Sequence, residues 1–117
     1  MQPEKSSHHH IDLLEAIEKI LRYTDGMDFE AFSADEKTQD AVLRNLTIIG
    51  EVAARISQAA SAPMPDLPLD QMKGMRNIIV HEYFGVSLRV VWETVQADLP
   101  PLIPILKNLL EASNDSD

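Results

Sequence analysis

The segment Asp40–Ile56, with the sequence DAVLRNLTIIGEVAARI, decides the fold class of this chain. Its apolar residues recur every three or four positions, which is typical of an amphipathic α-helix with one buried face. We expect that face to consist of Val42, Leu46, Ile49, Ala53 and Ile56. The segment therefore predicts a long helix that packs against other helices.

Capping and helix-breaking residues set the limits of this helix. Ser33, followed three residues later by Glu36, has the form of a capping box and predicts the helix start. The apolar pattern fades over residues 59–61, before a proline-rich connector with prolines at positions 63, 65 and 68. The connector is short enough to keep the flanking helices in one domain.

Further amphipathic segments lie on both sides of the long helix. Residues 10–23 and residues 69 to 81 or 82 have helical spacing, and Gly26 and Gly85 mark their ends. Ser87 is a candidate N-cap for a fourth helix, which Pro100 and Pro101 separate from a fifth.

No stretch alternates polar and apolar residues as a strand would, so we expect an all-α fold, an up-down bundle of four to five helices. A single helical domain is predicted over residues 11–112, after a polar tail of residues 1–10 and before a frayed tail of residues 113–117. Three histidines, His8 to His10, fall in the first tail. We interpret them as solvated rather than as a metal site, because no carboxylate pattern or second histidine group accompanies them.

Composition limits the possible functions. The chain has 117 residues, a net charge of −9 and no cysteine. A length of this order is one domain, and the acidic balance disfavours non-specific binding to DNA or RNA phosphates. No apolar run approaches the roughly 20 residues that span a bilayer, and the N-terminus lacks the core of a signal peptide. We expect a cytoplasmic protein with no membrane partner, whose RNA contacts, if any, are local.

The segment Met75–Tyr83, MRNIIVHEY, holds the residues best suited to chemistry. His81 can accept or donate a proton near neutral pH, while Arg76 can present a planar, charged fork to phosphate oxygens. Together they suit attack of an RNA 2′-hydroxyl on the adjacent phosphorus, a reaction for which we expect neither metal nor cofactor. The alternative is structural, since a single histidine near a helix end is often a cap.

The spacing of these residues constrains how they could meet. On an ideal helix, positions five apart point about 140 degrees apart, whereas positions seven apart nearly coincide. Arg76 therefore aligns better with Tyr83 than with His81. Either the helix loosens so that His81 turns toward Arg76, or a second protomer supplies the matching residue across a two-fold axis. Glu51, on the preceding helix, is either solvated or paired with Arg76.

Arg76 to Tyr83 matches the Arg-x₄-His-x-Tyr motif of HepT-like toxins, a branch of the helical HEPN superfamily, and the chain resembles that family from about Ile11 to Leu110. The matching segments outside the motif are DLLEAI at residues 12–17, DAVLRNL at 40–46, IGE at 49–51 and YFGV at 83–86.

The resemblance implies a homodimeric, metal-independent endoribonuclease toxin with its cleft where two motif helices meet. It implies that Arg76 and His81 are catalytic, that Asn77 is a supporting polar position and that Glu51 is a candidate orienting carboxylate. Family members are paired with an MNT-type nucleotidyltransferase antitoxin that transfers AMP to the motif tyrosine, here Tyr83. The alternative function is a non-catalytic binding subunit of such a nucleotidyltransferase.

Overall fold

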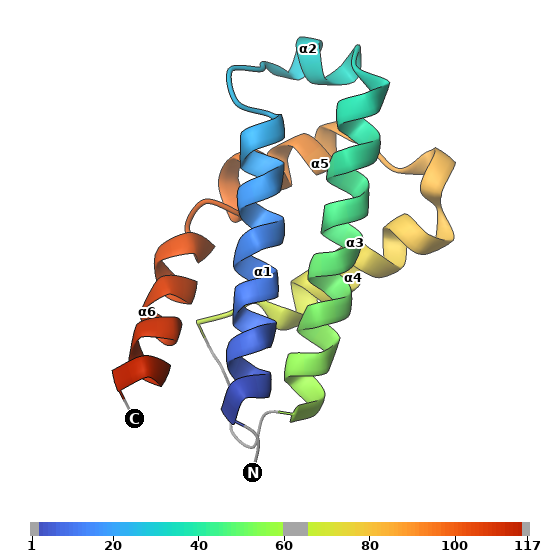
Figure 1. Cartoon of the computed structure of the whole chain (residues 1–117). Coiled ribbons are helices and arrows are strands. Elements are labelled where there is room, and N and C mark those ends of the chain that lie inside the picture. Colours follow the sequence, from blue (N-terminus) through green and yellow to red (C-terminus); the bar gives the residue numbers. More distant parts are fainter. Residues whose placement is uncertain (1–2, 60–65, 116–117) are drawn as a thin grey trace.

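The computed structural model describes residues 3–59 and 66–115, and every regular element in those ranges is helical (Figure 1). The α-helices are α1 (Pro3–Tyr23), α2 (Phe29–Ser33), α3 (Glu36–Ala59), α4 (Leu69–His81), α5 (Leu88–Glu93) and α6 (Leu102–Asp115). A 3-10 turn, η1 (Tyr83–Gly85), follows α4, and a π-helical turn, η2 (Thr94–Asp98), follows α5. The all-α prediction is confirmed, with six α-helices in the described residues rather than four to five. None of them is long and apolar enough to cross a membrane.

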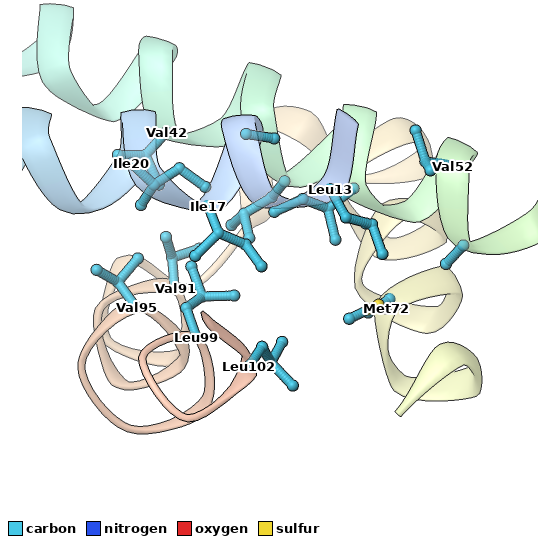
Figure 2. Close-up of a cluster of buried hydrophobic side chains, with 14 of the residues drawn as sticks. Leu13, Ile17, Ile20, Val42, Val52, Met72, Val91, Val95, Leu99 and Leu102 are labelled. Carbon is cyan, nitrogen blue, oxygen red and sulfur yellow. The ribbon is translucent and has the colours of Figure 1, made fainter. Parts of the chain in front are cut away.

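The two longest helices, α1 and α3, run antiparallel and side by side, and the other elements pack around them (Figure 1). Helix α4 packs on α3, α6 packs on α1, and α2 joins the ends of α1 and α3. Side chains from α1, α3, α4 and the segment from α5 to α6 converge on one core (Figure 2). The predicted apolar face of α3 is buried in this core, as expected.

Helix α1 begins at Pro3, earlier than the helix start predicted at residue 10, so it includes residues that were assigned to the polar tail. Proline is tolerated in the first turn of a helix, and no glycine or further proline interrupts the chain before Tyr23. The interpretation of the three histidines as solvated is wrong for His10, which is buried because it lies three residues before Leu13 and seven before Ile17, on the same face of α1. Burial lowers the pKa of His10 and the neighbouring His9 lowers it further, which favours the neutral imidazole.

The C-terminal end also differs from the expectation of a frayed tail over residues 113–117. Helix α6 continues to Asp115, because no glycine or proline follows Pro104 to end it. The last two residues of the chain lie outside the described ranges, as does the predicted proline-rich connector up to residue 65.

The start of α3 is capped by Asp35 and not by the predicted Ser33. The Thr38 backbone N–H donates to Asp35 Oδ1 over 3.1 Å, and the Thr38 hydroxyl donates to Oδ2 over 2.8 Å. These hydrogen bonds lower the pKa of Asp35. Ser33 instead ends the unpredicted helix α2, where its hydroxyl donates to the Glu30 carbonyl. Ser33 and Asp35 are both of a type that caps helices. Because Phe32 is buried in the core as part of α2, Ser33 belongs to that helix and Asp35 becomes the cap of α3.

The predicted cap of the next helix is confirmed, since Ser87 accepts from the Val90 backbone N–H over 3.2 Å. The helix that follows is not uniform, because α5 widens into η2, where the Leu99 N–H donates to the Thr94 carbonyl. Pro100 and Pro101 carry no N–H, so the α-helical pattern cannot continue beyond this turn.

Candidate active site

Arg76 lies at the contact between α3 and α4, where two neighbours hold its side chain. Its Nη1 pairs with Glu51 Oε1 at 2.5 Å, and its Nε donates to Asn77 Oδ1 over 2.8 Å. The Arg76 side chain is only 20% exposed, whereas that of Glu51 is 51% exposed. Of the two alternatives for Glu51, solvated or paired with Arg76, the pairing is therefore confirmed. These contacts within the described residues engage Nε and Nη1 and leave Nη2 for a phosphate oxygen.

Gly50 allows α4 to approach α3 closely at Arg76. A Cβ atom at Gly50 would overlap Arg76 Cβ, and it would lie 2.8 Å from Arg76 Cγ and 2.9 Å from the Met72 carbonyl oxygen. Only glycine fits this crossing without moving a helix. This role of Gly50 was not predicted from the sequence, although its position beside Glu51 is the signal that could have indicated one.

We predict that Gly50→Ala both destabilises the protein and reduces any activity that depends on Arg76. The added methyl group must push α3 and α4 apart, and overpacking of this kind costs about 1–3 kcal/mol. Urea unfolding and an activity assay on the folded variant measure the two effects. Gly85→Ala is the matched control, because its Cβ would meet open space. Wild-type stability in Gly50→Ala would contradict the crossing described here.

His81 is the last residue of α4 and is exposed. The helix stays regular through His81 and ends at Glu82, where φ is −133° and ψ is 43°. The alternative in which the helix loosens and His81 turns toward Arg76 is therefore wrong. Arg76 faces α3, while His81 leaves α4 about 140 degrees away around the helix axis. Arg76, Asn77 and Glu51 are brought together within one chain, and His81 is not placed with them.

His81 shares a stripe of α4 with Ile78 and Gly74, three and seven residues before it. Ile78 is 48% exposed, and a Cβ at Gly74 would meet open space. An apolar groove of about 420 Å³ runs beside this stripe. Its lining includes Ile49, Met72, Gly74, Met75, Ile78 and Leu99.

Tyr83 lies outside α4, in η1, so the expected alignment of Tyr83 with Arg76 along a continuous helix is wrong. Its phenolic hydroxyl donates to Asp40 Oδ1, near the start of α3, over 3.0 Å. This hydrogen bond raises the pKa of Tyr83, and desolvation and the charge of Asp40 raise it further. The Tyr83 residue remains 44% exposed. The contact of Asp40 was not predicted, because no pattern in the sequence joins residues 40 and 83.

The segment after α4 projects from the side of the bundle (Figure 1). Phe84 in this segment is fully exposed, and its ring meets the Tyr83 ring edge-on, with the centroids 5.4 Å apart. Val80 and Val90 are also about half exposed, at 56% and 49%. Tyr83 and Phe84 therefore expose two neighbouring aromatic rings in η1.

Residues 13–109 match the family model described as Ribonuclease HepT-like. The chain belongs to this family. A protein of Thermococcus cleftensis named "Probable ribonuclease HepT" is 45% identical over 91 residues, which make up 78% of this chain and 83% of that protein. No solved structure matches the chain.

More distant members of the HepT-like family match over similar lengths. A Methanocaldococcus jannaschii protein, named as a candidate RNase, is 34% identical over 78% of this chain and 75% of its own length. A Caldanaerobacter subterraneus protein, also named as a candidate RNase, is 32% identical over 85% of this chain and 88% of its own length. Family membership confirms the resemblance to HepT-like proteins of the HEPN superfamily.

Proposed function

We propose that this HepT-like protein is a metal-independent endoribonuclease and the toxin of a toxin-antitoxin pair. The proposal rests on the fixed orientation of the Arg76 side chain. Glu51 and Asn77 hold its guanidinium by hydrogen bonds at the α3–α4 crossing. A held guanidinium is suited to binding the non-bridging oxygens of a phosphodiester. The names of the relatives, which describe ribonucleases, support RNA as the substrate.

The proposed reaction needs a proton acceptor, a proton donor and a group that stabilises charge on phosphorus. A histidine takes the proton of the 2′-hydroxyl, and the 2′-oxygen bonds to the adjacent phosphorus. The bond from phosphorus to the 5′-oxygen breaks, and a second histidine donates a proton to that oxygen. Arg76 stabilises the charge on the non-bridging oxygens. The products are a 2′,3′-cyclic phosphate and a 5′-hydroxyl.

The histidines of this reaction come from two copies of the chain, so we propose a homodimer that joins along the stripe of Gly74, Ile78 and His81. Within one chain, Arg76 and His81 leave α4 in different directions, and there is one histidine in the motif. A two-fold axis beside the stripe brings a second α4 near the first, and Gly74 permits a close helix approach. The half-exposed Ile78 and the neighbouring apolar groove would then be covered.

We predict that Ile78→Asp converts the dimer to a monomer and abolishes cleavage. In the dimer, the substitution would bury a charge at the centre of the proposed interface. In the single chain, residue 78 is half exposed, so the charge would stay in contact with water and the fold would persist. Light scattering measures the mass, and circular dichroism checks that the helices persist. Val80→Asp, which alters an exposed apolar residue of α4 that does not share the stripe, is the control. A wild-type chain that is monomeric while it cleaves RNA would contradict the composite site.

An assay of purified protein on RNA in excess chelator tests the function itself. A ribonuclease of the proposed kind cuts RNA under these conditions. The rival function, a binding subunit for a nucleotidyltransferase, predicts intact RNA and a stable complex with that enzyme. Intact RNA at all protein concentrations would overturn the proposal.

We also propose that an MNT-type nucleotidyltransferase antitoxin inactivates this protein by transferring AMP to Tyr83. Tyr83 is 44% exposed, which leaves the residue within reach of another enzyme. Tyr83 follows His81 by two residues, so attached AMP would put a negative phosphodiester and a bulky nucleoside beside the proposed proton-transfer group. The added charge would repel an RNA phosphate, and the added volume would exclude the strand.

A further inference from the structure

Asp40 is an exposed carboxylate on α3 whose only described side-chain partner is the phenol of Tyr83. The two residues are 43 positions apart in the sequence, so the contact exists only because the fold places Tyr83, in η1, within reach of Asp40 on α3. The distance of 3.0 Å, from Tyr83 Oη to Asp40 Oδ1, is within the reach required for direct proton transfer.

We propose that Asp40 is the general base for modification of Tyr83, so that this chain supplies part of the catalytic machinery for its own inactivation. The inference rests on the AMP transfer proposed above. The hydrogen bond already fixes the direction of the phenolic proton, which points at Asp40 and leaves a lone pair of the oxygen for an incoming phosphorus. A modifying enzyme then needs only to bring ATP to a prepared hydroxyl.

The step balances with ATP as the donor. The phenolic oxygen of Tyr83 bonds to the α-phosphorus of ATP as its proton passes to Asp40. The bond between the α-phosphorus and the oxygen that bridges to the β-phosphate breaks, and pyrophosphate leaves with the electron pair. An aspartate that takes the proton of an acceptor hydroxyl is an established arrangement in phosphoryl transfer.

A base is needed at this position because the same contact makes spontaneous ionisation of the phenol harder. The hydrogen bond to Asp40 stabilises the protonated phenol, and desolvation and the charge of Asp40 add to this effect, so the pKa of Tyr83 is raised. The phenolate is therefore a rare species near neutral pH. Concerted removal of the proton by Asp40 avoids that species, since the phenol oxygen and the carboxylate never both carry a full negative charge.

The test compares Asp40→Asn with wild type in a reaction with α-labelled ATP and a purified MNT-class nucleotidyltransferase. Asparagine keeps an oxygen that can accept the Tyr83 hydrogen bond, but it cannot take the proton. We expect AMP incorporation to slow by about 100-fold near pH 7, the range typical of a lost general base. Circular dichroism and thermal unfolding verify that the variant is folded.

A pH profile separates proton transfer from a positioning role. Asp40→Asn must react through the phenolate, so its rate should rise about tenfold per pH unit below the phenol pKa, and the deficit relative to wild type should shrink toward pH 9. The ratio of the two rates cancels the titration of groups common to both proteins. A purely structural role would give the same deficit at every pH and would overturn the inference.

Glu36→Gln is the matched control for charge. Glu36 lies one turn before Asp40 on the same helix and is exposed, so the substitution removes a nearby negative charge without touching Tyr83. Arg44, one turn later, and Glu82, next to Tyr83, are unchanged in both variants. Glu36→Gln should react at the wild-type rate. If wild type and Asp40→Asn take up label equally fast, only the role of Asp40 as a base is refuted. If wild-type Tyr83 takes up no label, the proposed AMP transfer is refuted as well.

Discussion

Arg76→Ala and His81→Ala should each abolish RNA cleavage and toxicity in cells while the protein stays folded. Loss of the guanidinium removes the group that stabilises charge on phosphorus, and comparable losses lower catalytic rates by about 100- to 1,000-fold. Loss of the imidazole removes proton transfer, with a similar expected effect. Neither side chain belongs to the apolar core, so helicity and the unfolding midpoint should change little. Cleavage rates on a defined RNA and thermal unfolding measure both expectations.

Lys73→Ala is the control for a general loss of positive charge. Lys73 lies on α4 one turn before Arg76, but it pairs with Asp70 over 3.3 Å rather than with Glu51. Its removal should leave most of the cleavage rate. If Lys73→Ala and Arg76→Ala were equally impaired, the role of Arg76 would be one of non-specific attraction. If either Arg76→Ala or His81→Ala cut RNA at the wild-type rate, the catalytic assignment of that residue would be wrong.

Tyr83→Phe should remain fully toxic when the cognate antitoxin is co-expressed, whereas wild type should be silenced. Phenylalanine keeps the ring but has no oxygen to receive AMP. Its loss of the hydrogen bond to Asp40 removes one exposed contact, so we expect the fold to persist. Survival of cells that express each toxin with the antitoxin is the readout, and peptide mass spectrometry should locate AMP on Tyr83 of wild type.

Tyr23→Phe provides the control for this experiment, because Tyr23 is exposed to a similar degree, 40% against 44% for Tyr83, at the end of a different helix. It should be silenced like wild type. Silencing of Tyr83→Phe to the same extent as wild type would show that modification of this tyrosine is not the control mechanism.

The helical core was predictable from sequence because its signal is local. The apolar periodicity of α3 and the bounds of α4 follow from residues one or two turns apart, and the structure confirms both. The extension of α1 to Pro3 was missed because the polar residues before Ile11 show no apolar periodicity. His10 is nevertheless buried, on the same face of α1 as Leu13. Helix α2 was missed because its five residues are too few to show a period.

The candidate site was only partly predictable, since its contacts join distant positions. The residue types Arg76 and His81 could be selected from their chemistry, and the pairing of Arg76 with Glu51 could be raised as one of two alternatives. The clearance at Gly50 and the contact of Tyr83 with Asp40 depend on how α3, α4 and η1 pack. The end of α4 at His81, which separates Tyr83 from the face of Arg76, is likewise set by the turn that begins at Glu82.

The chemical ends of the RNA fragments test the central claim most directly. A defined oligoribonucleotide is incubated with the purified protein in excess chelator, and mass spectrometry identifies the termini. Attack by the 2′-hydroxyl, with Arg76 and His81 as the acting groups, predicts a 2′,3′-cyclic phosphate on one fragment and a 5′-hydroxyl on the other. Fragments with 3′-hydroxyl and 5′-phosphate ends that form only when a divalent metal is added would contradict the account.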